Sequence, residues 1–206
     1  MESYTTIEGT AAATIVEKKS EFIASASFAD TEASALRFLE EVRAEHRTAN
    51  HNVYAYLLRE NSRTRYSDDG EPQKTAGLPV LEVLRHSGLT DLIVVVTRYF
   101  GGTLLGTGGL VRAYTSAAQA ALEQARRVTV RPCVDLSAVL PYALYEQGAR
   151  LAAAAGAKVR DTRFTDEVTL ELTLLEGVET PLLEQLSELC RGKLRAQVGK
   201  PYYAPF

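Results

Sequence analysis

The amino-acid sequence predicts an α+β protein that folds as two domains. Its 206 residues exceed the roughly 150 typical of one domain and by length alone fit either one generous domain or two compact ones. Several segments alternate apolar and polar residues, as half-buried strands do, and segments with helical spacing separate them. A hydrophobic content of 46% is enough for a buried core and argues against a disordered chain.

The first half is predicted to mix strands and helices. Its strands cover residues 21–28, 52–58 and 91–99. Asp30 is expected to cap a first helix, a second helix covers 79–86, and a third runs from Thr107 or Gly108 to about Ala125. The strand at 91–99 is apolar on both faces, so we expect it at the centre of a sheet. Residues 59–76 are predicted as a polar loop.

The second half is predicted to run strand, helix, strand, strand, helix, strand. The strands cover residues 134–140, 157–164, 167–174 and 193–198, the last with Leu194, Ala196 and Val198 facing inward. Thr180 as N-cap and Pro181 at the first position are expected to open the second helix. This order is typical of a split βαβ, ferredoxin-like domain. A break near 126–132 gives domains 1–130 and 131–206.

Charge and composition limit the function classes. The chain has 23 lysines and arginines against 26 acids, a net charge of −3. This balance excludes binding to nucleic acid by bulk charge, so any RNA contact must be a local patch. Its longest aliphatic run, residues 92–96, is far below the ~20 residues of a membrane span, and no secretory signal is visible. We therefore expect a cytoplasmic protein with no membrane contact, in which Cys133 and Cys190 are buried thiols.

An acidic loop is the first unusual feature. Three carboxylates stand within four positions in Ser67-Asp68-Asp69-Gly70-Glu71-Pro72, with Thr75 close behind. A calcium-type metal loop needs alternating acidic positions closed by a distant Glu, and this spacing is absent. A turn or helix-capping loop is therefore favoured over a metal site, and no metal is predicted. An acid–base pair is less favoured, because neighbouring side chains on a bent loop need not converge.

A glycine-rich segment is the second unusual feature. Five glycines lie within nine positions between a buried strand and a helix: Gly101, Gly102, Gly106, Gly108 and Gly109. Backbone N–H groups at the start of a helix favour anions, so phosphate binding around Thr107 is a hypothesis. The dinucleotide fingerprint is absent because Val111 replaces its third glycine. The nucleotide P-loop is excluded because Thr107 stands where the lysine belongs.

Arg98, Tyr99 and His51 are further candidate binding residues. Arg98 beside Tyr99 could stack on bases and grip phosphate, or Arg98 could pair with an acid of the loop; the sequence leaves both open. His51 is expected to donate within a polar cluster. No nucleophile elbow occurs, and neither cysteine has a histidine nearby in sequence, so no catalytic residue and no cofactor is predicted.

Taken together, these residues resemble the YigZ/IMPACT family, formerly uncharacterised protein family 0029. The resemblance covers the whole chain for the bacterial two-domain form. Glu21 departs from it, since a basic residue is usual there. The motifs that carry it are Lys18-Lys19-Ser20-x-Phe22, His51, Ser67-Asp68-Asp69-Gly70-Glu71-Pro72, Thr75-Ala76-Gly77-x-Pro79 and Val94-Val95-x-x-Arg98-Tyr99-Phe100-Gly101-Gly102-x-x-Leu105-Gly106-x-Gly108-Gly109-Leu110.

The resemblance implies more than the residues do alone. It implies an N-terminal domain like domain two of a small-subunit ribosomal protein and domain IV of elongation factor G. The C-terminal domain would resemble domain V of that factor, in agreement with the predicted ferredoxin-like order. Eukaryotic relatives regulate translation through interference with a starvation kinase, using an extra N-terminal domain that this chain lacks, so this partner role is not transferred.

The leading hypothesis is a non-enzymatic, translation-linked regulatory protein that contacts RNA or the ribosome. A small-ligand or phosphate-binding enzyme that uses loops 67–72 and 98–109 is one alternative. An adaptor that binds a protein partner through its ferredoxin-like domain is another. The predicted binding residues are His51, Ser67, Asp68, Asp69, Glu71, Thr75, Arg98, Tyr99, Gly101, Gly102, Gly106, Thr107, Gly108 and Gly109.

Overall fold

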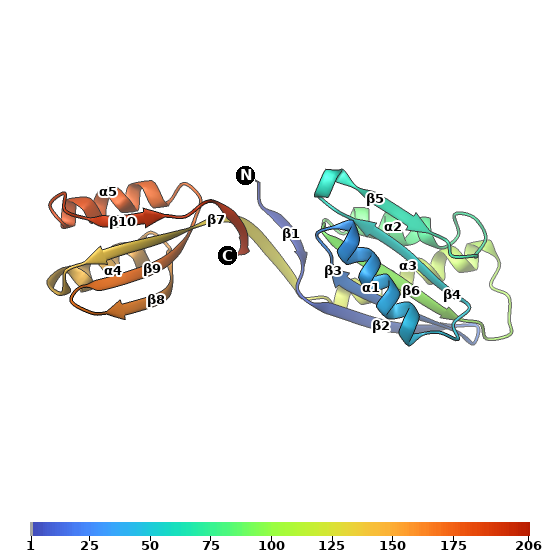
Figure 1. Ribbon diagram of the computed structural model, residues 1–206. Coiled ribbons are helices and arrows are strands. Elements are labelled where there is room, and N and C mark those ends of the chain that lie inside the picture. Colours follow the sequence, from blue (N-terminus) through green and yellow to red (C-terminus); the bar gives the residue numbers. More distant parts are fainter. Residues whose placement is uncertain (1) are drawn as a thin grey trace. The chain divides into compact units, whose positions relative to one another are not determined.

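The computed structural model describes residues 2–206 and divides into two compact units (Figure 1). One unit is Tyr4–Val128, and the other is Thr129–Phe206 together with residues 2–3. Each unit has its own hydrophobic core.

The N-terminal unit is built on a five-stranded antiparallel sheet in the order β2-β3-β6-β4-β5. β6, which is apolar on both faces, lies at the centre, so this prediction is confirmed. β1 precedes β2 and lies outside this sheet, and a short 3-10 helix, η1, lies between β4 and β5. The bounds are β1 Tyr4–Ile7, β2 Thr10–Glu17, β3 Ser20–Phe28, β4 His51–Leu57, η1 Glu60–Ser62, β5 Thr64–Ser67 and β6 Leu92–Tyr99.

Helices cover both faces of this sheet. α1 (Glu32–Glu45) packs on one face, where Leu39 and Val42 meet Ile93 and Val95 of β6. α2 (Gly77–His86) and α3 (Thr107–Gln124) pack on the other face, over Val94 and its neighbours (Figure 1). The two faces of β6 therefore pack into two separate cores, which explains why its sequence has no polar face.

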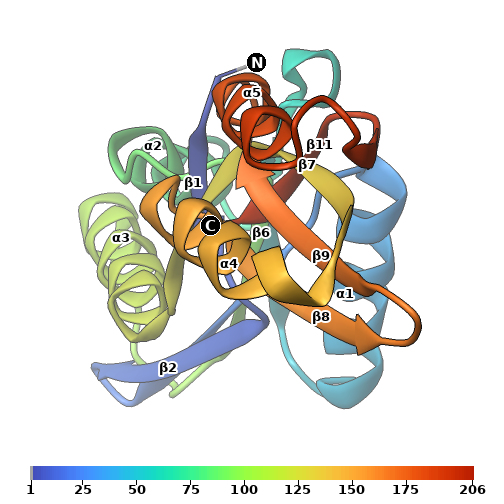
Figure 2. The same ribbon diagram turned by 90° about the vertical axis from the view of Figure 1, so that its left-hand side faces the viewer.

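The C-terminal unit is a ferredoxin-like domain. Its sheet has the antiparallel order β10-β7-β9-β8, and α4 and α5 pack together on one face (Figure 2). This is the predicted strand-helix-strand-strand-helix-strand order. The bounds are β7 Arg127–Leu140, η2 Tyr142–Leu144, α4 Tyr145–Ala154, β8 Lys158–Phe164, β9 Val168–Leu175, α5 Glu179–Leu189, β10 Arg195–Val198 and β11 Tyr202–Pro205.

Several local predictions are wrong. Thr31, not Asp30, is the N-cap of α1, and α5 starts at Glu179, so Thr180 lies inside that helix. In β10, Ala196 and Val198 are exposed instead of facing the core. The predicted loop 59–76 contains β5, and β1, β2 and β11 were not predicted. α3 ends at Gln124 as expected, and the basic and β-branched residues 127–132 that follow it begin β7, which is longer than the predicted strand 134–140.

Two expectations from composition can be compared with the structure. Cys133 and Cys190 are both buried free thiols, and burial raises the pKa of each. Among residues 2–206, no helix combines the length and hydrophobicity that crossing a bilayer requires.

The cap of α1 gives a first prediction. The Thr31 hydroxyl accepts from the Ser34 N–H at 3.2 Å, and the Ser34 hydroxyl accepts from the Thr31 N–H at 3.2 Å. Thr31→Ala removes this capping box and should lower the free energy of unfolding by about 1 kcal/mol in urea titration. Asp30→Ala is the matched control, because Asp30 contacts only the Ser34 hydroxyl at 3.4 Å. An equal loss in both variants would contradict this assignment.

Candidate functional site

The two unusual loops of the sequence meet at one end of the N-terminal sheet. β6 ends at Tyr99 and β4 begins at His51, and the register places His51 opposite Arg98. On the other side of β6, Phe22 lies opposite Arg98. Because neighbouring residues across a sheet project to the same face, Phe22, Arg98 and His51 form a row on the face that α2 and α3 cover.

Glu71 of the acidic loop closes over this row and forms a polar cluster, here called the Glu71 cluster: Ser20, His51, Glu71, Arg98 and Tyr114. Glu71 Oε1 accepts from Arg98 Nη1 at 2.6 Å and from the Tyr114 hydroxyl at 2.8 Å. His51 Nε2 lies 3.8 Å from the same oxygen. Glu71 and Arg98 are only 8% and 6% exposed, so this ion pair is buried. Burial and the Glu71 carboxylate both raise the pKa of Tyr114, which therefore stays a neutral donor.

The Arg98 side chain is thus buried and bonded within the protein. Of the two roles left open by the sequence, the structure shows the pairing with a loop carboxylate. Its Nη2 lies 3.5 Å from the Ser20 hydroxyl, and its guanidinium carbon lies 5.4 Å from the centre of the Phe22 ring. Arg98 Nε has no hydrogen-bond partner in residues 2–206, although it is fully buried. One donor of the buried guanidinium is therefore left for a water or another small molecule.

Asp68 organises the acidic loop as a helix cap. Its carboxylate accepts from the backbone N–H groups of Lys74 at 2.8 Å, Ala76 at 3.1 Å and Gly77 at 2.8 Å. Ala76 and Gly77 lie at the start of α2, where backbone donors have no partner within the helix, and Lys74 lies in the turn that precedes it. Thr75 supports the same turn, since its hydroxyl donates to the carbonyl of Pro72 at 2.6 Å.

Asp69 ties the loop to β4 and α1. Its carboxylate accepts from the Asn52 N–H at 2.6 Å and lies 3.5 Å from Arg43 Nη2. The Ser67 hydroxyl accepts from the Asp69 N–H at 3.2 Å. The Asp69 carbonyl lies 2.8 Å from His51 Nδ1. Because a carbonyl can only accept, Nδ1 carries a proton and Nε2 is the nitrogen turned toward Glu71.

The glycine-rich segment lies against the turn between β2 and β3. A Cβ on Gly101 would lie 2.0 Å from the backbone carbon and oxygen of Lys19, so only glycine fits there. Gly102 and Gly106 have φ of 82° and 74°, which glycine adopts without strain. Thr107, Gly108 and Gly109 form the first turn of α3, and Gly106 supplies no side-chain cap. Tyr99 follows Arg98 on β6, so its side chain lies on the face of the sheet opposite to that of Arg98, where its hydroxyl lies 3.0 Å from His46 Nδ1.

Two parts of the site were not predicted as binding residues. Tyr114 falls within the apolar stripe of α3, where the sequence gives no sign that its hydroxyl reaches a buried carboxylate. Lys18 and Lys19 form the two-residue turn between β2 and β3, with φ of 47° and 66°. A turn between two alternating strands could have drawn attention to both lysines.

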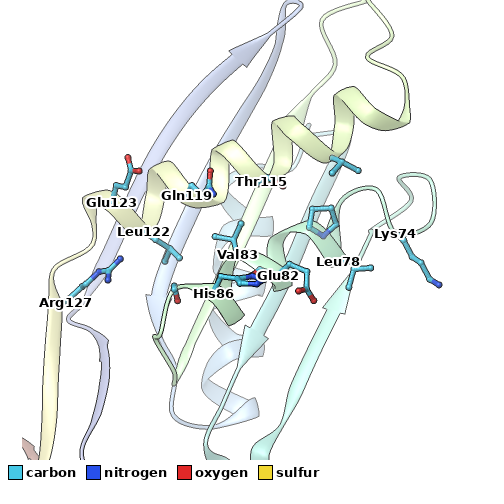
Figure 3. A pocket seen from close by; sticks show the side chains of 13 residues that line it. Lys74, Leu78, Glu82, Val83, His86, Thr115, Gln119, Leu122, Glu123 and Arg127 are labelled. Atoms are coloured by element: carbon cyan, nitrogen blue, oxygen red, sulfur yellow. The ribbon is translucent and has the colours of Figure 1, made fainter.

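A separate groove of about 670 Å³ lies between α2 and α3 (Figure 3). Its floor is mostly apolar, with Leu78, Val83 and Leu122, and Lys74 and Arg127 lie at opposite ends in this view. No predicted site residue lines it. Within residues 2–206, no three His, Cys, Asp or Glu side chains are arranged to hold a metal ion.

Comparison with known proteins assigns the family. Residues 18–122 match the family model of the Impact N-terminal domain, and residues 139–193 match a domain of unknown function, DUF1949. The chain belongs to the IMPACT family. The family member YigZ of Escherichia coli (strain K12) is 34% identical over 187 residues, which cover 88% of this chain and 92% of YigZ.

Two further family comparisons agree. The family member YvyE of Bacillus subtilis (strain 168) is 46% identical over 115 residues, so the match spans about half of each protein, 55% of this chain and 53% of YvyE. A crystal structure of a hypothetical protein with 32% identity superposes with a TM-score of 0.64 and covers 95% of this chain and 97% of its own.

The buried ion pair gives a second prediction. Arg98→Met leaves the Glu71 carboxylate buried without its cation, which should lower the free energy of unfolding by about 3–5 kcal/mol. The double variant Glu71→Leu/Arg98→Met removes both charges and should recover at least half of that loss. Urea unfolding of the two single variants and the double variant measures the coupling. A double variant as unstable as the sum of the single ones would contradict it.

The contact of Gly101 gives a third prediction. Gly101→Ala forces a Cβ into the Lys19 backbone and should lower the free energy of unfolding by about 3 kcal/mol. Gly108→Ala is the matched control, since its Cβ would meet only Arg112 Nη1 at 3.5 Å. Thermal unfolding should place the control at or slightly above the native chain, because alanine favours helix. Equal melting temperatures for both variants would count against the close approach.

Proposed function

We propose that this IMPACT family member is a non-enzymatic, translation-linked cytoplasmic protein that contacts RNA, including RNA exposed on the ribosome. The link to translation is what the family resemblance implies. The contact surface is the lysine turn together with the glycine loop, which we call the turn-loop surface: Lys18, Lys19, Phe100, residues 101–106 and Arg112.

The conformation of the lysine turn is the observation that carries this proposal. A two-residue hairpin turn with positive φ at both positions strongly favours Asn-Gly, because other residues are strained there. Lys18 and Lys19 both occupy this left-handed region, which costs on the order of 1 kcal/mol for each residue. Strain of this kind is typical of functional sites. Two lysines held at an exposed hairpin tip at a cost to stability favour a role for their charges.

The adjoining loop supplies the other contacts that RNA needs. Phe100 is 46% exposed and Leu104 is 83% exposed, so an aromatic ring and an apolar side chain face solvent beside the lysines. The first turn of α3 offers backbone N–H groups without a side-chain cap. Aromatic rings stack on bases, and lysines and helix starts attract phosphate. Glu17 and Glu21 flank the turn and oppose its positive charge, so we expect modest affinity for RNA. Because the lysines would contact phosphates, this affinity should fall steeply as salt is raised.

A small-ligand site is the second candidate, and one observation favours it. Arg98 Nε is buried without a hydrogen-bond partner among residues 2–206, and His51 Nε2 lies 3.8 Å from the Glu71 oxygen that accepts from Arg98 Nη1. This arrangement could hold a small polar molecule. The remaining groups of the Glu71 cluster are already bonded to one another, which favours a structural role for the cluster and the RNA proposal for the surface.

The lysine turn gives a fourth prediction, in which stability and binding move in opposite directions. Lys18→Asn/Lys19→Gly relieves the strained turn, so the free energy of unfolding should rise by about 1 kcal/mol. The same change removes two cations, so ribosome co-sedimentation from lysate at low salt should fall at least fivefold. Phe100→Ser should also weaken co-sedimentation, through loss of stacking.

A charge-neutralising control variant and the salt dependence of co-sedimentation complete this test. Arg37→Gln/Arg85→Gln removes two exposed cations from α1 and α2 and should leave co-sedimentation unchanged. High salt should abolish binding of the native chain. Binding that persists in high salt, or that is the same in the native chain and the Asn-Gly variant, would rule out the turn-loop surface. A melting temperature raised by nucleotides or phosphorylated metabolites would then support the small-ligand candidate.

A further inference from the structure

Phe100 lies over the buried Arg98 side chain at the surface of the N-terminal unit. The Arg98 guanidinium carbon lies 5.6 Å from the centre of the Phe100 ring and 5.4 Å from the centre of the Phe22 ring. Phe22 and Arg98 are 0% and 6% exposed, whereas Phe100 is 46% exposed. A cation lies over the face of an aromatic ring because that face carries partial negative charge. Phe100 therefore turns one face toward Arg98, and its exposed area lies on the outer face and the ring edge.

Hydrogen bonds hold the backbone that carries this ring. The Phe100 N–H donates to Asn50 Oδ1 at 2.8 Å, and the Gly101 N–H donates to the Ser20 hydroxyl at 3.1 Å. Gly101 also lies against the Lys19 backbone, where a Cβ would come within 2.0 Å. The ring is thus held in place before any ligand arrives. A ligand that stacks on it has little conformational freedom to remove from the protein.

The buried cation favours one kind of ligand for the outer face of Phe100. Arg98 already interacts with the negative charge of the ring from the inner side. A second cation on the outer face, such as an amine or a guanidinium, would therefore gain less than it gains on an isolated ring. A flat, neutral and electron-rich group is not penalised in this way. Nucleobases are groups of this kind, and every base has a face with which it can stack on an aromatic side chain.

Cations beside the ring fit the phosphates of the same strand. Lys18 and Lys19 form the turn that touches Gly101. Arg112 Nη1 would lie 3.5 Å from a Cβ on Gly108, which places this guanidinium at the first turn of α3. These cations are few beside the roughly 6–10 phosphate contacts of a protein that binds a duplex mainly by charge. Contact with a base must therefore supply a large share of any affinity.

We propose that the turn-loop surface binds single-stranded RNA, with one unpaired base stacked on the outer face of Phe100 and the adjoining phosphates held by the cations beside it. In a duplex each base face is covered by its neighbours, so Phe100 can reach a base only after that base leaves the stack. This inference rests on the proposed function and narrows its substrate to unpaired nucleotides. Arg98 has the part of a positioning residue, since it contacts the inner face of the ring and not the RNA.

Tryptophan fluorescence tests the stacking directly, because the chain has no tryptophan of its own. In the full-length Phe100→Trp variant, emission should be quenched when a mixed-sequence single strand of ~10 ribonucleotides is added, since a base stacked on indole quenches it. The same strand annealed to its complement should leave the emission unchanged at equal concentration. Leu36→Trp is the matched control, because Leu36 is 36% exposed and lies on α1, on the opposite face of the sheet. It should show no quenching with either RNA.

Fluorescence anisotropy of the same labelled strand keeps the test decisive if the tryptophan variant does not fold. The native chain should bind the single strand at least ~fivefold more tightly than the duplex. Phe100→Leu keeps an apolar side chain but cannot stack, so it should weaken binding to the single strand at least ~fivefold. Phe100→Tyr keeps the ring and should bind as the native chain does.

The outcomes separate this inference from the proposed function. Equal affinity for single strand and duplex, an unquenched Phe100→Trp, or a Phe100→Leu variant that binds as the native chain does would each overturn the stacked base. Weaker binding of both RNA forms by Lys18→Asn/Lys19→Gly would in that case still support an RNA contact through charge. A native chain that binds neither RNA form and does not co-sediment with ribosomes would overturn both proposals.

Discussion

The buried ion pair between Glu71 and Arg98 is the constraint on which one end of the N-terminal unit depends. It joins the acidic loop to the end of β6, and the Tyr114 hydroxyl adds α3 to the same carboxylate oxygen. Removing two charges from water costs several kcal/mol for each ion, and this cost is offset only where geometry and extra hydrogen bonds are good. The acidic loop, the glycine loop and α3 must therefore keep their places together, or an uncompensated charge is left buried.

This constraint also determines what the surface presents. Arg98 is the next-to-last residue of β6 and its side chain is held inward, so the chain leaves the sheet at a fixed point and direction. Gly101 then passes close to the backbone of Lys19, because it has no Cβ. The lysine turn and the exposed Phe100 are brought side by side by these buried contacts. A cluster without exposed chemistry can thus support a binding surface through position alone.

The sequence predicted the regular elements well where periodicity was long and unambiguous. β6 was placed at the centre of a sheet because it is apolar on both faces, and β9 was evident from eight alternating residues. The short strands β1, β5 and β11 were missed, since four residues are too few for a period to be seen, and the eight residues of β2 were missed because its alanine-rich sequence does not alternate clearly between apolar and polar residues. The cap of α1 was displaced by one residue because Asp30 and Thr31 are both good N-caps, and only the observed bond to Ser34 separates them.

The candidate site was less predictable, because its main property is which residues meet. Asp68, Asp69 and Glu71 are similar in sequence, yet Asp68 caps a helix, Asp69 binds the backbone of Asn52 and Glu71 pairs with Arg98. These roles depend on a loop whose path is set by tertiary contacts, and no periodic pattern encodes that path. The strained φ values of Lys18 and Lys19 are likewise a consequence of a tight hairpin, which the sequence alone did not reveal. Buried charge and backbone strain both lower stability, and here both lie at the same end of one sheet. A scaffold that served stability alone would favour Asn-Gly in the turn and apolar side chains in the cluster, so the coincidence of the two features is the physical reason for the site that we propose at this end.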